Sequence, residues 1–176
     1  MFSFLYKGNG PDVTDRVWLS MGAMQAGIGQ WLRDNSNGMA AVWFRQDMEA
    51  LRKTLPEDLA ARVVATDSLT TESLQGKQLL VVGHYPLQST EATFAEQLGL
   101  KKLLIFSALD SPLFKRFGGD KIIEVARGMG MKEQEGIEHF LVSSSIKKTQ
   151  GKISDTVSNE MQATSEEEWM HLNLPQ

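Results

Sequence analysis

The sequence predicts a three-layer α/β/α domain built on a parallel β-sheet, with a helical extension at its C-terminus. Two observations lead to this prediction. Short apolar runs typical of buried strands alternate with segments whose apolar residues recur at helical spacing, as in βαβ units. The length of 176 residues suits one ordinary domain with a substantial core and is too short for two large ones.

The composition excludes several classes of protein. A hydrophobic fraction of 41% with 23% charged residues is typical of a globular chain. The net charge of −4 argues against tight nucleic-acid binding, and the absence of cysteine excludes a disulfide framework and argues against a zinc ribbon. Lys7 and Gly8 interrupt the apolar start before a signal-peptide core forms, and no run reaches the roughly 20 residues of a membrane span. We therefore expect a cytoplasmic protein without a membrane span.

The N-terminal part of the chain is predicted to be an arm followed by a strand and a helix. Residues 1–15 form the arm, with GNGP as a turn, and residues 16–19 are β-prone. Ser20 is placed to N-cap a helix that extends to about residue 33. Three glycines inside it each lower helix propensity by up to about 1 kcal/mol: Gly22, Gly27 and Gly29.

Four later segments are predicted strands, because each is a short apolar run bounded by turn residues. They are residues 39–44, 61–65, 79–83 and 103–106. Helices are predicted between them, at residues 45–55 and 89–98, and Pro56 and Pro86 mark breaks. This alternation requires crossover connections and places helices on both faces of the sheet.

The pattern changes after the last predicted strand. Short helices are expected at residues 111–117 and 121–127, the second N-capped by Asp120, and a connector at residues 137–140. Residues 143–163 are predicted to form one long polar helix that needs a neighbour or a partner to hold it. Trp169, in the acidic tail, is either docked on the body or exposed. The chain thus divides into the arm (1–15), an α/β domain (16–128), and a connector and C-terminal helix with an acidic tail (129–176).

The C-terminal half carries a resemblance to a known family. The run IFSALDSPLFKRFGGDKIIEVARGMGMKEQEGIEHFLVSSSIKKTQG, residues 105–151, resembles part of the SecA preprotein translocase ATPase family. There, the last strand of the second nucleotide-binding domain leads through a phenylalanine-glycine turn, a glycine-terminated helix and an IEH segment into a long scaffold helix. Residues 105–119 and 129–148 carry the matching motifs. The resemblance implies a RecA-like fold for the α/β domain.

A less specific resemblance extends toward the N-terminus. Residues 16–32 match the lead-in to the second motor domain of the family, and residues 38–55 match the strand and helix that follow. LLVVGHYPLQS, residues 79–89, lies where the family has a strand ending in GTE. The specific part of the resemblance begins at about Leu103.

The chain departs from the family in the residues needed for ATP hydrolysis. No phosphate-binding G-x-x-x-x-G-K-[ST] loop, GRGTD loop or arginine motif occurs. The stretch that should carry the arginines is FAEQLGLKKLLIF, in which Gln97 and Gly99 are possible relics. Lys101 and Lys102 cannot supply the planar bidentate fork of arginine. We therefore expect no ATP hydrolysis, no bound cofactor and no catalytic residues.

Three histidines were considered as site residues. His84, His139 and His171 lie too far apart to match a zinc-site spacing, so no metal site is predicted. His84 follows a strand and is either part of a ligand site or a loop residue in place of the family's TER segment. The resemblance places His139 at the IEH position, where a structural contact is expected.

Polar residues follow two of the strands. Asp67 and Ser68 follow one, and Ser107 and Asp110 follow another. Because doubly wound sheets bind ligands at the carboxyl ends of their strands, these residues either line a small-molecule site or cap the next helices. The FGGD stretch at residues 117–120 lacks the rest of a phosphate loop, and the family uses it as a turn. No G-x-S-x-G elbow supports a serine hydrolase.

Two groups of side chains near the C-terminus could serve as contact surfaces. Lys147, Lys148 and Lys152 form a basic face that is either solvated or docks a partner or acidic lipid. Met129 and Met131 either pack in the core or form an adaptable surface.

The resemblance and the missing motifs together predict a function. We expect a non-catalytic, SecA-like module that binds or regulates a protein partner, such as the translocation machinery or a separate motor half. The alternative is a domain that binds a small molecule or nucleotide through the loops after Val82 and Phe106.

Overall fold

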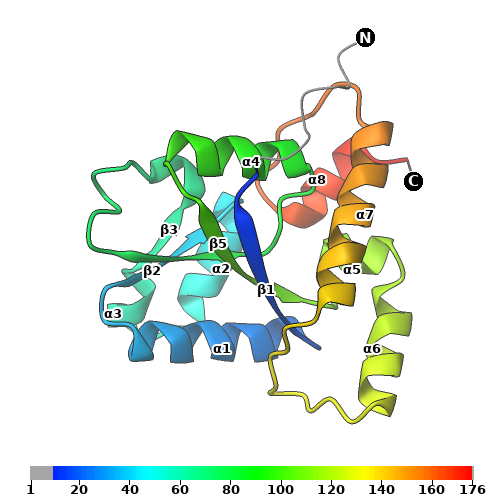
Figure 1. The fold of residues 1–176 in the computed structure, drawn as a ribbon, viewed down its shortest axis with the longest axis horizontal. Helices are drawn as coiled ribbons and strands as arrows, with labels where there is room; N and C mark the ends of the chain where they lie inside the picture. The colour runs from blue at the N-terminus through cyan, green and yellow to red at the C-terminus, as the bar shows by residue number, and fades with distance from the viewer. Residues whose placement is uncertain (1–9, 176) are drawn as a thin grey trace.

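The fold is an open, all-parallel β-sheet with helices on both faces (Figure 1). In a computed structural model, residues 10–175 are described, and residues 1–9 of the predicted arm lie outside the described part. The strands are β1 (Asp12–Trp18), β2 (Gly38–Val42), β3 (Val63–Ala65), β4 (Gln78–Val82) and β5 (Lys102–Ala108). Their spatial order is β1-β5-β4-β2-β3. The predicted three-layer α/β/α fold is confirmed and is consistent with a RecA-like domain. The strand boundaries differ from the prediction by one to four residues, and the largest difference is in β1, which begins at Asp12 rather than at Arg16.

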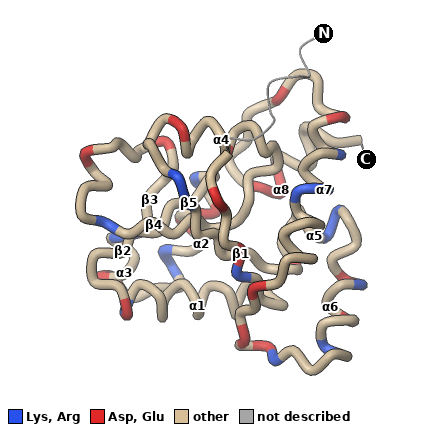
Figure 2. Tube along the Cα trace, viewed as in Figure 1, with Lys and Arg blue, Asp and Glu red and all other residues tan. Residues whose placement is uncertain are grey.

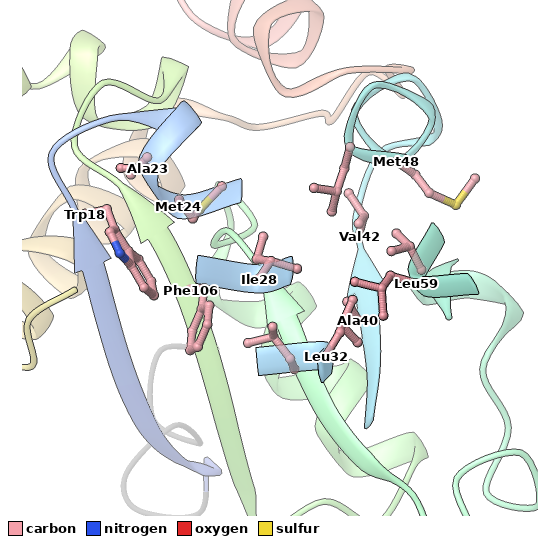
Figure 3. Close-up of a cluster of buried hydrophobic side chains, with 14 residues drawn as sticks. Trp18, Ala23, Met24, Ile28, Leu32, Ala40, Val42, Met48, Leu59 and Phe106 are labelled. Carbon is pink, nitrogen blue, oxygen red and sulfur yellow. The ribbon is translucent and has the colours of Figure 1, made fainter. Parts of the chain in front are cut away.

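One face of the sheet is covered by α1 (Met21–Asp34), α2 (Arg45–Lys53) and α3 (Glu57–Ala60). Ser20 caps α1 as predicted, because its Oγ accepts a hydrogen bond from the backbone N–H of Ala23 at 3.2 Å. Figure 3 shows Ile28 of α1 beside Phe106 of β5, whose ring lies 4.7 Å from the indole of Trp18 between ring centroids. Burial of these large apolar side chains fixes α1 against the sheet.

The opposite face packs mainly against α4 (Gln88–Gln97) and the long helix α7 (Phe140–Thr156). Val81 and Ile105 are fully buried in this layer beside Phe94 of α4. Figure 1 shows α4 and α1 on opposite sides of the sheet. The alternation of side chains along β4 and β5 explains the two cores, because neighbouring residues of a strand face opposite layers.

The chain turns sharply between α5 (Pro112–Arg116) and α6 (Gly119–Gly128). The N-cap of α6 is Gly118, not Asp120 as predicted, because the turn needs a left-handed residue and Gly118 has φ of +90°. A Cβ on Gly119 would lie 2.4 Å from the carbonyl oxygen of Leu109. The FGGD stretch is therefore a tight structural turn.

The C-terminal segment differs from the prediction. Instead of one helix at residues 143–163, α7 spans Phe140–Thr156, and a separate helix α8 covers Glu166–Asn173. Trp169 of α8 is fully buried against Phe44 and Tyr85, so the tail docks on the body. Ser165 begins α8 by accepting the N–H of Glu168 at 3.1 Å.

The predicted connector at residues 137–140 joins the sheet to α7. Ile137 forms an antiparallel bridge with Val17 of β1, with both N–H groups donating at 2.9 Å. Phe140 already belongs to α7. Within residues 10–175, no helix combines the length and apolarity that crossing a bilayer requires.

Candidate functional site

A cavity of about 370 Å³ opens at the carboxyl ends of β2, β4 and β5. The residues that follow β2 and β4 line it, among them Phe44 and His84. The chain leaves β2 toward β3 on one side and leaves β4 toward β5 on the other, so strand order reverses between β2 and β4. Open α/β sheets bind ligands at such a switch point. The cavity therefore lies at the loops after Val82 and Phe106, where the alternative prediction from the sequence expected a ligand site.

The charged residues lining the cavity are acidic, apart from His84. Asp47 comes from α2, and Glu166 and Glu167 come from the first turn of α8. None of the described residues that line it is lysine or arginine. Figure 2 shows acidic residues at the start of α8 and basic residues on α7, whereas α6 carries residues of both signs. An acidic lining repels phosphate groups and attracts cations.

Asp47 and Glu166 lie next to each other across two elements. The backbone N–H of Glu166 donates to Oδ2 of Asp47 at 2.9 Å and so ties α8 to α2. Burial raises the pKa of Glu166 to about 8, and the charge of Asp47 adds to this rise. Burial also raises the pKa of Asp47, although the hydrogen bond from Glu166 opposes it. The raised pKa of Glu166 keeps most of this residue protonated at neutral pH, and a cation bound beside the pair would favour the ionised form.

Behind the cavity, His84 lies between two buried carboxylates. Its Nε2 is 2.6 Å from Oδ1 of Asp15 on β1, and its Nδ1 is 2.8 Å from Oε1 of Glu91 on α4. The backbone N–H of Tyr85 donates to the same Glu91 oxygen at 2.8 Å. The cluster therefore joins a strand, a helix and the loop after β4 beneath the cavity.

The cluster holds His84 in its charged form. Burial alone would lower the pKa of His84, but the charge of Glu91 and the hydrogen bond to Asp15 raise it to about 10. Burial would likewise raise the pKa of Asp15, yet His84, a hydrogen bond from Ser143 and the charge of Lys147 lower it. A doubly bonded imidazolium has no lone pair with which to act as a general base or to bind a metal. Among the described residues, no group of three or more His, Cys, Asp or Glu could hold a metal ion.

Ser107 is the unusual polar residue of the cavity wall. It lies on β5 opposite Val17 of β1, and only 3% of its surface is exposed. Its Oγ is the one buried side-chain polar atom of the described chain that lacks a hydrogen-bond partner. An unpaired buried hydroxyl costs about 1–3 kcal/mol, so a ligand that bonds to it would recover that energy.

The other residues considered from the sequence have structural surroundings. Ser68 donates to the carbonyl of Ala65 at 2.7 Å, and Asp110 accepts the N–H of Met21 at 2.7 Å. Asp67 lies beside Ser68 in the turn at Thr66–Ser68, away from this cavity. Ser68 and Asp110 therefore brace turns, which was one of the two predicted alternatives, and Asp67 lines other, separate hollows.

The remaining histidines lie on the surface and far from the cavity lining. His139 caps α7, because its Nδ1 accepts the N–H of Leu141 at 3.3 Å, in agreement with the predicted structural contact. His171 is exposed in the last turn of α8. Sequence reasoning missed four acidic residues of this region: Asp15, Asp47, Glu91 and Glu166.

A second feature is the exposure of large apolar side chains around the connection between α6 and α7. Val125 and Met129 are 61% and 83% exposed, and Phe140 and Leu141 are 71% and 57% exposed. Met131 instead packs against the core beside Ile146. Of the two roles predicted for these methionines, Met131 therefore has the core-packing role, and Met129 is exposed as a contact surface would be. Lys147, Lys148 and Lys152 are exposed on α7.

Comparison with known proteins finds a short similarity to one protein. No family model matches the sequence. A segment of 48 residues is 46% identical to the protein translocase subunit SecA of Psychrobacter cryohalolentis and of Psychrobacter arcticus. The SecA of Acinetobacter baumannii is 42% identical over 48 residues. In each case the match covers 27% of this chain and only 5% of the length of the relative.

Proposed function

We propose that this chain is a non-catalytic, SecA-like module that binds a protein of the translocation machinery. The similarity of one segment to SecA supports a link to translocation. The exposed pair Phe140 and Leu141, at the start of α7, carries the proposal for a protein partner. Two large apolar side chains that are adjacent in the chain and both exposed are typical of an interaction surface.

The absence of ATP hydrolysis is part of the same proposal. The carboxyl edge of the sheet offers acidic residues where a nucleotide would require cations for its phosphates. His84 provides no free positive charge, because Asp15 and Glu91 flank it. We expect phosphate release from ATP to stay at the background rate, in the presence and absence of SecA.

The partner proposal is tested by direct binding. SecA is titrated onto the immobilised chain, and the affinity is compared with that of the double variant Phe140→Ser, Leu141→Ser. We expect the double variant to bind at least about tenfold more weakly, because interface anchors are few and apolar. Met161→Ser is the matched control, since Met161 is 54% exposed but lies beyond α7.

Two results would contradict the proposal. One is a wild-type chain that does not bind SecA, although circular dichroism shows it to be folded. The other is equal affinity of the wild type and the double variant. Loss of binding in the Met161→Ser control would show that the α6–α7 connection is not the relevant surface.

A further inference from the structure

The cavity at the carboxyl edge of the sheet has the size and walls of a small-molecule site. Its volume of about 370 Å³ lies at the lower end of the range for ligand pockets. Its apolar walls come from α1 and α5, with Met24 on one and Leu113 on the other. Val82 at the end of β4 also lines it. A compact ligand with an apolar body fits these walls.

The polar part of the cavity selects the charge of that ligand. Asp47 and Glu166 are joined through the N–H of Glu166, and no described lysine or arginine of the lining neutralises them. His84 contributes no net attraction for anions, because two carboxylates contact its ring. A positively charged group would compensate the carboxylates, whereas a phosphate or carboxylate would add to the repulsion.

The hydroxyl of Ser107 is a second polar feature of the cavity wall, separate from the carboxylates. Native proteins pair most buried polar atoms, so the hydroxyl of Ser107 would gain from a hydrogen bond to a water molecule or to a ligand. Ser107 lines the cavity, and its Oγ is buried without a hydrogen bond. An N–H donor of a ligand would satisfy it.

We propose that this cavity binds a small organic cation, a protonated amine with an apolar body, through Asp47 and Glu166 and with Ser107 as a further hydrogen-bond partner. An ammonium group supplies the positive charge and three donors. An organic cation is favoured over a metal ion, because the other walls are apolar and offer few oxygen ligands. The inference does not depend on a protein partner and concerns a different surface.

The first test maps binding on the wild-type chain by NMR, with hexylammonium as the probe. Hexanoate and ATP serve as anionic probes of the same cavity. Hexylammonium is expected to shift the backbone amide signals of Gly83, Ser107 and Glu166 in a saturable way, and the anions are not. Equal shifts from hexanoate, or hexylammonium shifts that lie elsewhere, would overturn the proposal.

The second test uses matched variants in calorimetry. Asp47→Asn keeps an oxygen that can accept the N–H of Glu166 but removes the charge, and Glu166→Gln removes the second charge. At about pH 8.5, where Glu166 is mostly ionised, each is expected to weaken hexylammonium binding by about tenfold or more. Glu49→Gln, on the exposed side of α2, is the control and should bind like the wild type. Unchanged affinity in both cavity variants would contradict the assignment.

The pH dependence gives a further readout. The groups that act on Glu166 are Asp47 from α2, the backbone N–H of Leu113 and, more weakly, His84 from the loop after β4. Glu167 is its charged neighbour. Because Glu166 ionises with a raised pKa, hexylammonium should bind more tightly at about pH 8.5 than at about pH 6.5. The Glu166→Gln variant should lose most of this difference. Failure here leaves the SecA titration unaffected, since that assay contains no hexylammonium.

Discussion

At the residue scale, His84 shows how one side chain can connect three elements. It carries a positive charge inside the protein because Asp15 and Glu91 each contact one ring nitrogen. Removing one member of a buried ionic cluster is costly, since the remaining charges stay desolvated without a partner. The cluster thus stabilises the loop that forms the floor of the cavity.

The substitution His84→Gln tests this role. We expect the free energy of unfolding at neutral pH to fall by about 3–5 kcal/mol, because the two carboxylates lose their cation. Urea denaturation measures the change. His139→Gln is the control and should cost about 1 kcal/mol or less, since His139 is exposed and only caps α7. Equal losses in the two variants would show that the cluster contributes little.

At the element scale, two glycines of α1 have different surroundings. Gly27 faces Trp18, and a Cβ there would lie 2.5 Å from Cζ2 of the indole. Gly22 has no atom within 4 Å of such a Cβ. Only the first glycine is needed for packing, so the low helix propensity noted in the sequence has a structural reason at Gly27.

The pair Gly27→Ala and Gly22→Ala separates packing from propensity. Gly27→Ala should destabilise the protein by about 1–3 kcal/mol, because the added methyl must displace the indole. Gly22→Ala should be neutral or stabilise it by up to about 1 kcal/mol, through helix propensity alone. Thermal unfolding of the two variants measures both effects. A stabilising effect of Gly27→Ala would contradict the close packing of Trp18.

Some elements could be predicted from the sequence because their signals are local. β4 is a continuous apolar run, and Ser20 precedes a helical pattern. Helix α8 was missed although Ser165 and Glu168 have the spacing of a capping box, because three glutamates made the segment look like a solvated tail. The limits of α7 were missed because polar residues dominate both the helix and the segment that follows it.

The position of the candidate site could be predicted from the sequence, but the residues that form it could not. Strand ends give its position, since parallel strands bring them to one edge. The His84 cluster depends on pairing residues far apart in sequence, through strand register that no local pattern encodes. A partial signal existed in Asp15, an acid between Val13 and Val17 on the buried face of β1, which requires a partner.

At the scale of the whole molecule, two groups, the buried His84 and the half-buried Glu166, couple folding to pH. The pKa of His84 is raised from 6.5 to about 10, and that of Glu166 from 4.5 to about 8. In both cases the folded chain binds the proton more tightly than the unfolded chain. Their stabilising contributions are therefore complete below the unfolded pKa and are lost as pH rises through the folded pKa. The windows overlap between pH 6.5 and 8.

The free energy of unfolding should therefore decrease between about pH 6 and pH 9. In Glu166→Gln this decrease should be smaller, and at about pH 9 the variant should exceed the wild type by about 2 kcal/mol, because it has no charge to bury. At about pH 5 the two should converge. Urea denaturation across this range measures the difference, with the exposed Glu124→Gln as control. A constant difference at all pH values would contradict the raised pKa of Glu166.

Helix α8 covers part of the surface at the carboxyl ends of the strands. Trp169 is buried against residues that follow β2 and β4, and its Nε1 donates to Glu160 at 2.7 Å. A protein that bound at these strand ends would first have to displace α8. Its apparent affinity would therefore be reduced by the free energy with which α8 packs on the domain. A protein that bound at the α6–α7 connection would not have to displace α8. The connection and the cavity at the strand ends could therefore be occupied at the same time.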